Sequence, residues 1–161
     1  KNQNKPGYFT VELIKPVSPL FFDNKKKSIC ILAASSILKI LLAEGQANKK
    51  IYNSFENLID CLINKQWIKE YILWELSLVK ELGYEVNFYN KDRVLNNSIK
   101  INDRLFKVPN ILINNNITKF SDADIKDALI FNRNLLIESF IIPNKLRFPL
   151  SRNILQKYYS K

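Results

Sequence analysis

The sequence predicts a mainly α-helical fold: a helical bundle with a small, irregular or β insertion and one strand near its N-terminus. Several stretches place apolar residues three and four positions apart, the spacing of a helix with one buried face. Hydrophobic residues make up 47% of the 161 positions, which is enough for a sizeable core. No apolar run reaches the roughly 18 to 20 residues that cross a bilayer, so we expect no membrane partner.

Two helices are expected in the first 65 residues, each beginning at a side chain that can cap backbone N–H groups. One runs from Asp23 or Asn24 to about Glu44, and the next runs from Asn48 to about Lys65. In both, apolar residues recur at helical spacing. Each helix is therefore expected to bury one face in the bundle.

Residues 66–82 are predicted to form the central helix. Apolar residues cover more than half of its circumference, which is typical of a helix packed on several sides. We interpret Trp67, Tyr71 and Trp74 as core residues rather than as a surface for stacking bases. Glu75 lies among them, and we expect a buried acid that pairs with a basic residue or a capping group. No second carboxylate is placed to make it catalytic.

The rest of the chain is predicted to combine short strands with two further helices. Tyr8–Ile14 and Tyr84–Phe88 alternate apolar with smaller or polar residues, which is typical of strands. Residues 90–116 are rich in Asn and are interpreted as a loop region with one or two short strands. A pattern like a capping box begins a helix from Ser121 to about Ile141, and Ser151–Tyr159 can form a short terminal helix.

The inventory of side chains argues against an enzyme and against a metal site. The chain has no His, and its two cysteines, Cys30 and Cys61, each lie inside an apolar helical pattern. We interpret both as small core residues rather than as a disulfide. A four-ligand zinc site, histidine acid–base chemistry and a Gly-rich phosphate loop all lack their residues. We therefore expect no cofactor and no catalytic activity.

The net charge of +10 suggests a polyanionic partner, most simply nucleic acid. It arises from 25 basic and 15 acidic residues. A second explanation stays open, because Lys, Asn and Ile are all abundant, and an AT-rich genome would raise the lysine content without any function. Charge alone does not decide between these two explanations.

Two clusters of basic residues are the candidate DNA contacts, because cations that neutralise phosphates release counterions. No acidic residue follows Glu138, whereas basic residues continue to the end of the chain. Three lysines open the first helix, where they oppose the helix dipole, which mildly suggests a ligand. The alternative for both clusters is an ordinary solvated surface. The candidate DNA-binding residues are Lys25, Lys26, Lys27, Lys145, Arg147, Arg152 and Lys157.

Five stretches, in the same order along the chain, resemble the RecO family of bacterial recombination mediators. The most recognisable is WELSLVKELGYEVNF, which contains the end of the central helix. GYFTVELI is similar to the last strand of the family's N-terminal OB-fold, and residues 19–65 are similar to its first bundle helices. NDRLFKVPNIL resembles the stretch that leads out of the family's zinc-binding region. FSDADIKDALIFNRNLLIESF, followed by PLSRNIL, resembles its C-terminal helices.

The resemblance implies a division of the chain. Residues 1–16 are expected to be a remnant of the OB-fold, most of which this sequence lacks, and residues 17–161 a RecO-like helical domain. Within that domain, residues 84–120 are expected to be a reduced insertion. Many relatives open a four-cysteine zinc site just after the GY pair, but residues 89–92 contain no cysteine here. We therefore do not expect zinc.

The resemblance also implies a function, that of a non-enzymatic mediator of DNA repair and homologous recombination in the RecF pathway. It implies binding to single- and double-stranded DNA, annealing of complementary strands, contacts with RecR and with the acidic C-terminal tail of single-stranded-DNA-binding protein (SSB), and a cytoplasmic, nucleoid-associated location. For the tail we expect an apolar groove between the central helix and the 121–141 helix, rimmed by Lys69, Lys80 or Arg133. The alternative is a helical protein-interaction module that does not itself bind DNA.

Overall fold

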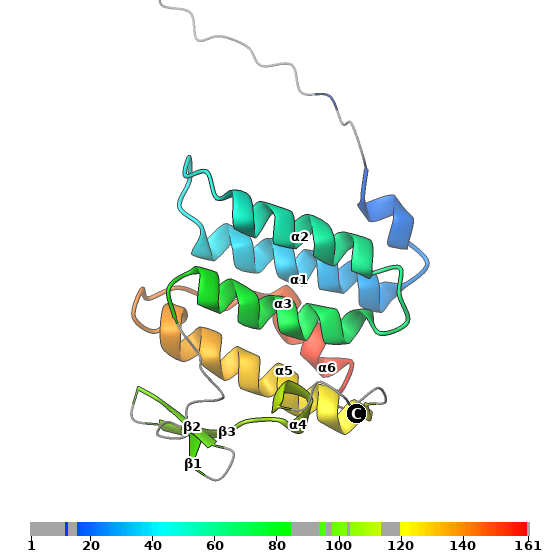
Figure 1. Cartoon of the computed structure of the whole chain (residues 1–161). Helices are drawn as coiled ribbons and strands as arrows, with labels where there is room; N and C mark the ends of the chain where they lie inside the picture. Colours follow the sequence, from blue (N-terminus) through cyan, green and yellow to red (C-terminus); the bar gives the residue numbers. More distant parts are fainter. Residues whose placement is uncertain are drawn as a thin grey trace, which may run out of the picture.

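The structure, a computed structural model, describes residues 12, 16–84, 94–95, 98–102, 104–113 and 120–160. Over these residues the chain is mainly helical, as predicted, with one small sheet (Figure 1). The elements in chain order are the 3-10 turn η1 (Ser18–Phe21), helices α1 (Lys25–Leu41), α2 (Lys49–Cys61) and α3 (Trp67–Glu81), strands β1 (Val94–Leu95), β2 (Ser98–Ile101) and β3 (Arg104–Lys107), helices α4 (Asn110–Ile113) and α5 (Asp122–Leu136), the π-helical turn η2 (Ile137–Ile141) and helix α6 (Leu150–Lys157).

Helix α3 lies at the centre of the bundle, as the sequence predicts. It packs against α2 on one side and α5 on the other, while α6 packs against α1 (Figure 1). Trp67, Tyr71 and Trp74 are all buried in the hydrophobic core. Their assignment to the core is therefore confirmed. In the view of Figure 1 the small sheet lies on the far side of α5 from α3.

The first two helices begin at the side chains expected to cap them. Asn24 Oδ1 accepts a hydrogen bond from the Lys27 backbone N–H at 3.1 Å, and Asn48 Oδ1 accepts one from the Ile51 N–H at 3.1 Å. Each bond satisfies a donor that the first turn of a helix leaves without an intrahelical partner. Both helices end three or four residues earlier than predicted, at Leu41 and Cys61.

The sheet is antiparallel, with three short strands in the order β1-β2-β3, where the sequence indicated one or two strands. The turn between β2 and β3 is attached to η2, the turn that follows α5. Arg104 Nη1 donates to Glu138 Oε1 at 2.6 Å, and Asn102 Nδ2 donates to the Glu138 carbonyl at 2.9 Å. The strands predicted at 8–14 and 84–88 lie outside the described residues, apart from Glu12 and Tyr84.

Helix α5 starts with the predicted capping box. The Asp124 backbone N–H donates to Ser121 Oγ, and the Ser121 N–H donates back to Asp124 Oδ2 at 3.0 Å. The α-helix ends at Leu136, and its helical path continues to Ile141 as the π-helical turn η2. Pro143 follows after one further residue, in keeping with its role as a helix breaker.

A buried ion pair joins α3, α5 and α6. Arg152 of α6 and Glu75 of α3 are both fully buried, and Arg152 Nη2 donates to Glu75 Oε2 at 3.0 Å and to the Leu129 carbonyl of α5 at 2.8 Å. Tyr71 Oη and Asn132 Nδ2 also donate to the Glu75 carboxylate, at 2.7 and 3.2 Å. The expectation that Glu75 is a buried acid with a basic partner is therefore confirmed.

The assignment of Arg152 to DNA binding is wrong. Its side chain has no exposed surface, and its guanidinium is held by Glu75. Burial by itself would lower the pKa of Arg152, but the adjacent carboxylate raises it, so the arginine stays charged inside the core. Its charge is thus used to attach α6 to α3 and is not available to a phosphate.

Replacing Arg152 with Met should destabilise the fold strongly, because the Glu75 carboxylate would stay buried without its charged partner. We expect the free energy of unfolding, measured by urea titration with circular dichroism, to fall by about 3 to 5 kcal/mol. The double variant Glu75→Leu/Arg152→Met buries no charge and should lose much less. Arg147→Met, at an exposed arginine, should change the stability by less than about 0.5 kcal/mol. A double variant no more stable than Arg152→Met would contradict this account.

Candidate nucleic-acid interface

The candidate site is built by α1 and α6, which pack side by side and run in opposite directions. The Lys26 Nζ lies 4.5 Å from the centre of the Tyr159 ring, just beyond the end of α6. Near the start of α6, Ser151 Oγ donates to the Leu32 carbonyl at 3.4 Å. The first turn of α1 therefore lies beside the end of α6, and the middle of α1 lies beside its start.

Helix α6 has a buried side and an exposed side. Arg152 and Leu155, three positions apart, are fully buried. Leu150, Ile154 and Lys157 are spaced by four and three residues, so they share the opposite side of the helix, and all three are exposed. The exposed side of α6 thus carries two apolar residues followed by a cation.

Helix α1 presents a similar line of exposed residues. Lys25, Leu32 and Lys39 follow one another at intervals of seven, which is close to two helical turns, and each is exposed. Residues at this spacing lie along one side of a helix. A lysine therefore marks each end of the line, and a leucine lies in the middle.

An apolar groove of about 440 Å³ lies between these two exposed sides. Leu150 is 72% exposed and Leu32 is 55% exposed, so the groove is bordered by large apolar side chains that are open to solvent. Lys39 and Arg147 contribute a cation each to the same lining. The groove is lined by Ile29, Leu32, Ser36, Lys39, Ile40, Arg147, Pro149, Leu150, Ser151 and Ile154. We call this surface the α1–α6 face: these groove residues together with Lys25 and Lys157.

The charge on the α1–α6 face has one sign. Neither residues 24–43 nor residues 139–161 contain an Asp or Glu. Lys39 and Arg147 lie together at one end of the groove. Lys25 and Lys157 lie toward the other end, since the start of α1 is beside the end of α6. Such a face can bind an extended polyanion that also offers apolar surface, because both kinds of contact are available along one line.

The neighbouring lysines in the first turn of α1 contact aromatic rings. Lys26 lies over Tyr159, and the Lys27 Nζ lies 5.9 Å from the centre of the Phe21 ring. Burial raises the pKa of Tyr159, so its phenol remains neutral beneath the ammonium group. Both lysines are half-buried; Lys26 lies beside the end of α6, whereas Lys27, two residues after Lys25, lies on another side of α1. Both ring contacts are favourable, and only the Lys26 contact lies next to the α1–α6 face.

The structure thus brings together some of the predicted DNA contacts and separates others. Lys25, Arg147 and Lys157 belong to the α1–α6 face, and Lys145 is exposed in the segment that leads to it. Sequence reasoning missed Lys39, although its seven-residue spacing from Leu32 was a signal that could have found it.

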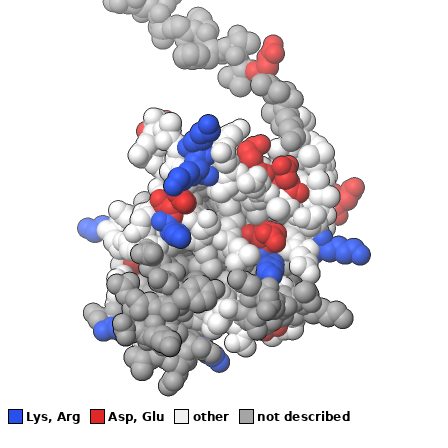
Figure 2. Space-filling model, viewed as in Figure 1, with Lys and Arg blue, Asp and Glu red and all other residues white. Residues whose placement is uncertain are grey.

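The surface of α2 and α3 has a different character. Figure 2 shows Lys or Arg and Asp or Glu side by side over these helices. The Lys50 Nζ lies 3.6 Å from a Glu81 carboxylate oxygen, in an ion pair between the two helices. Mixed charge of this kind does not favour a polyanion, so this surface serves as an internal comparison for the α1–α6 face.

The three cations predicted to rim a tail-binding groove are dispersed. Lys69 is at the start of α3, and its Nζ lies 5.0 Å from the centre of the Phe120 ring. Lys80 is exposed near the end of α3. Arg133 Nε donates to Asn153 Oδ1 of α6 at 3.2 Å. Arg133 is therefore directed toward α6 rather than toward α3.

The described parts of the chain contain no group of three or more His, Cys, Asp or Glu that could hold a metal ion. Among the helices that the structure describes, none has both the length and the apolar character needed to cross a bilayer.

Comparison with known proteins gives one family. Residues 24–93 match the family model described as "Recombination protein O C terminal". A protein named DNA repair protein RecO from Wolbachia sp. subsp. Drosophila simulans (strain wRi) is 35% identical over 83 residues, which are 50% of this chain and 35% of that protein. The protein of the same name from Rickettsia africae (strain ESF-5) is 31% identical over 81 residues, 50% of this chain and 34% of that protein. The match thus spans about a third of these relatives. No solved structure matches.

Proposed function

We propose, from the premise that this chain belongs to the RecO family, that it takes part in DNA repair and recombination by binding DNA along the α1–α6 face. The observation that carries the proposal is the pairing of α1 and α6, whose sequences lack any acid. Lys39 and Arg147 line one end of the groove between them, and Lys25 and Lys157 are exposed toward its other end. In this role the chain acts as a non-enzymatic mediator, which holds strands rather than altering them.

The dimensions of the face suit a short stretch of nucleic acid. Lys25 and Lys39 are separated by a rise of roughly 21 Å along α1, at 1.5 Å per residue. This corresponds to about six base pairs of duplex at 3.4 Å each. Because the contacts are to phosphates, they are equally suited to single- and double-stranded DNA.

Annealing of complementary strands would follow from the same electrostatics. Two single strands repel each other, and a surface of one sign lowers that repulsion when both strands bind near it. We therefore also propose that complementary strands bound at the α1–α6 face anneal there.

Removing two cations from the face should weaken DNA binding in a salt-dependent way. For single-stranded DNA each lost phosphate contact lowers the slope of log K against log salt by about 0.7, so Lys39→Gln/Arg147→Gln should lower it by about 1.4. Fluorescence anisotropy of a labelled oligo-dT, titrated at several salt concentrations, measures the slope.

The matched control is Lys49→Gln/Lys50→Gln, which removes two exposed cations from α2. This variant should leave the slope unchanged. Equal losses in the two double variants would show that the binding depends on net charge and not on the α1–α6 face. Absence of DNA binding by the unaltered chain would favour the alternative function, a helical protein-interaction module.

We further propose that the apolar groove within the face receives the acidic C-terminal tail of SSB, and that RecR is a second protein partner of the chain. A tail that combines carboxylates with apolar side chains is complementary to a groove lined by Leu32, Leu150 and Ile154 with Lys39 and Arg147 beside them. The tail and DNA would then share two cations and compete for them.

Leu150→Ser should weaken binding of the SSB tail but not of DNA, because it removes apolar surface without removing charge. Leu150 is largely exposed, so the fold should tolerate the change. We expect an SSB tail peptide to bind at least fivefold more weakly by isothermal titration calorimetry, while the salt slope for oligo-dT stays the same. Lys69→Gln, Lys80→Gln and Arg133→Gln, in the rim predicted from the sequence, test the other location. If they weaken the peptide and Leu150→Ser does not, the tail binds beside α3.

A further inference from the structure

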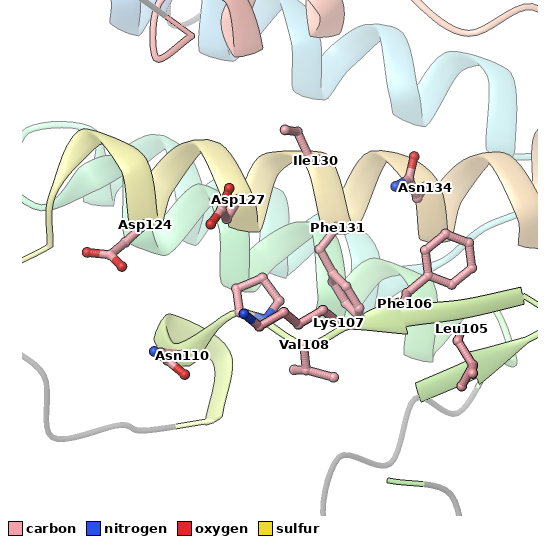
Figure 3. A pocket seen from close by; sticks show the side chains of 11 residues that line it. Leu105, Phe106, Lys107, Val108, Asn110, Asp124, Asp127, Ile130, Phe131 and Asn134 are labelled. Atoms are coloured by element: carbon pink, nitrogen blue, oxygen red, sulfur yellow. The ribbon is translucent and has the colours of Figure 1, made fainter. Parts of the chain in front are cut away.

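The geometry points to a second binding site, remote from the α1–α6 face: we propose that the pocket between α5 and the β3–α4 connection receives an arginine side chain of a partner protein. The pocket has a volume of about 340 Å³. Figure 3 shows Asp124, Asp127 and Asn134 along α5, with Phe106 and Asn110 on the segment opposite, and all five residues line the pocket. This proposal does not depend on DNA binding, since none of its residues belongs to the α1–α6 face.

The floor of the pocket is apolar and rigid. Val108 and Phe131 are almost completely buried, and Figure 3 shows the Phe131 side chain directed from α5 toward the β3–α4 segment. Phe106, from β3, is half-buried beside them and offers part of its ring to the pocket. An aromatic ring and aliphatic walls can accept the flat face of a guanidinium and its alkyl stem.

Two carboxylates from successive turns of α5 border this floor. Asp124 is held in place, because its Oδ2 accepts hydrogen bonds from the Ser121 N–H at 3.0 Å and from Ser121 Oγ at 2.6 Å. These bonds favour the ionised carboxylate and lower the pKa of Asp124. Asp127, three residues further along α5, is exposed. The pair forms an acidic border in a chain whose net charge is +10.

The chemistry of the lining selects among ligands. Two carboxylates repel a phosphate, and within the described residues no third acid, His or Cys joins them to build a metal site. Lys107 supplies one positive charge to the lining, so the carboxylates outnumber the cations there. A guanidinium suits both the acidic border and the apolar floor of the pocket. It binds a carboxylate through two parallel N–H donors, and its flat face stacks on an aromatic ring. A lysine ammonium is not planar and does not stack in this way.

The location of the pocket also suits a partner protein. Asp127 and Asn134 are seven residues apart and share one side of α5. Leu129 and Arg133, which contact α6, lie on the opposite side. A partner anchored in the pocket would therefore leave the α1–α6 face open, and both ligands could bind at once.

The test uses N-acetyl-arginine amide as the probe, titrated into the isotopically labelled chain and followed by amide chemical shifts. We expect saturable shifts at Phe106, Asn110 and Ile130, and an affinity at least fivefold lower for Asp127→Asn. The neutral isostere N-acetyl-citrulline amide should bind at least fivefold more weakly than the arginine probe. Asp60→Asn, which removes an exposed acid from α2, is the matched control and should leave the affinity unchanged.

Three results would overturn the proposal: no saturable shift at the pocket, equal binding of the citrulline and arginine probes, or equal losses in Asp127→Asn and Asp60→Asn. A titration with deoxycytidine monophosphate examines the competing ligand class. If the nucleotide shifts the same amides and the arginine probe does not, the pocket binds a base and the proposal fails. The α1–α6 face would be unaffected by any of these outcomes.

Discussion

The position of α6 depends on the ion pair between Arg152 and Glu75. A charge pair in the core is costly to desolvate, and it is tolerated here because Tyr71, Asn132 and the Leu129 carbonyl provide further hydrogen bonds. The pair requires α6 to turn one particular side inward. The opposite side, with Leu150, Ile154 and Lys157, is then necessarily outward beside α1. The surface that we propose for DNA and for the SSB tail thus exists because of a contact that neither ligand touches.

Much of the architecture could be predicted from local features of the sequence. Apolar spacing located the principal helices, and the caps at Asn24, Asn48 and Ser121 follow from side chains whose preference for helix starts is strong. The central place of α3 followed from its nearly continuous apolar circumference. The π-helical turn after Leu136 could not be predicted, because it depends on how the chain continues past α5 toward the β2–β3 turn and Pro143.

The candidate site was predicted less completely, for a physical reason. Arg152 occurs in a segment rich in cations, and nothing local distinguishes it from Arg147; its partner is Glu75, far away in the chain. Which cations face solvent is decided by tertiary contacts of this kind. Lys39 was missed for the converse reason: its spacing from Leu32 places it on one side of α1, but only the tertiary structure brings Arg147, just before α6, to the same groove.

The attachment of the β2–β3 turn has a mechanical consequence. Glu138 accepts a hydrogen bond from Arg104 through its carboxylate and one from Asn102 through its carbonyl, so a single residue of η2, just after α5, holds the hairpin. Strand β3 continues into one wall of the pocket in Figure 3, and α5 forms the other wall. The two hydrogen bonds at Glu138 therefore hold the wall of the pocket that comes from the hairpin against the wall that comes from α5.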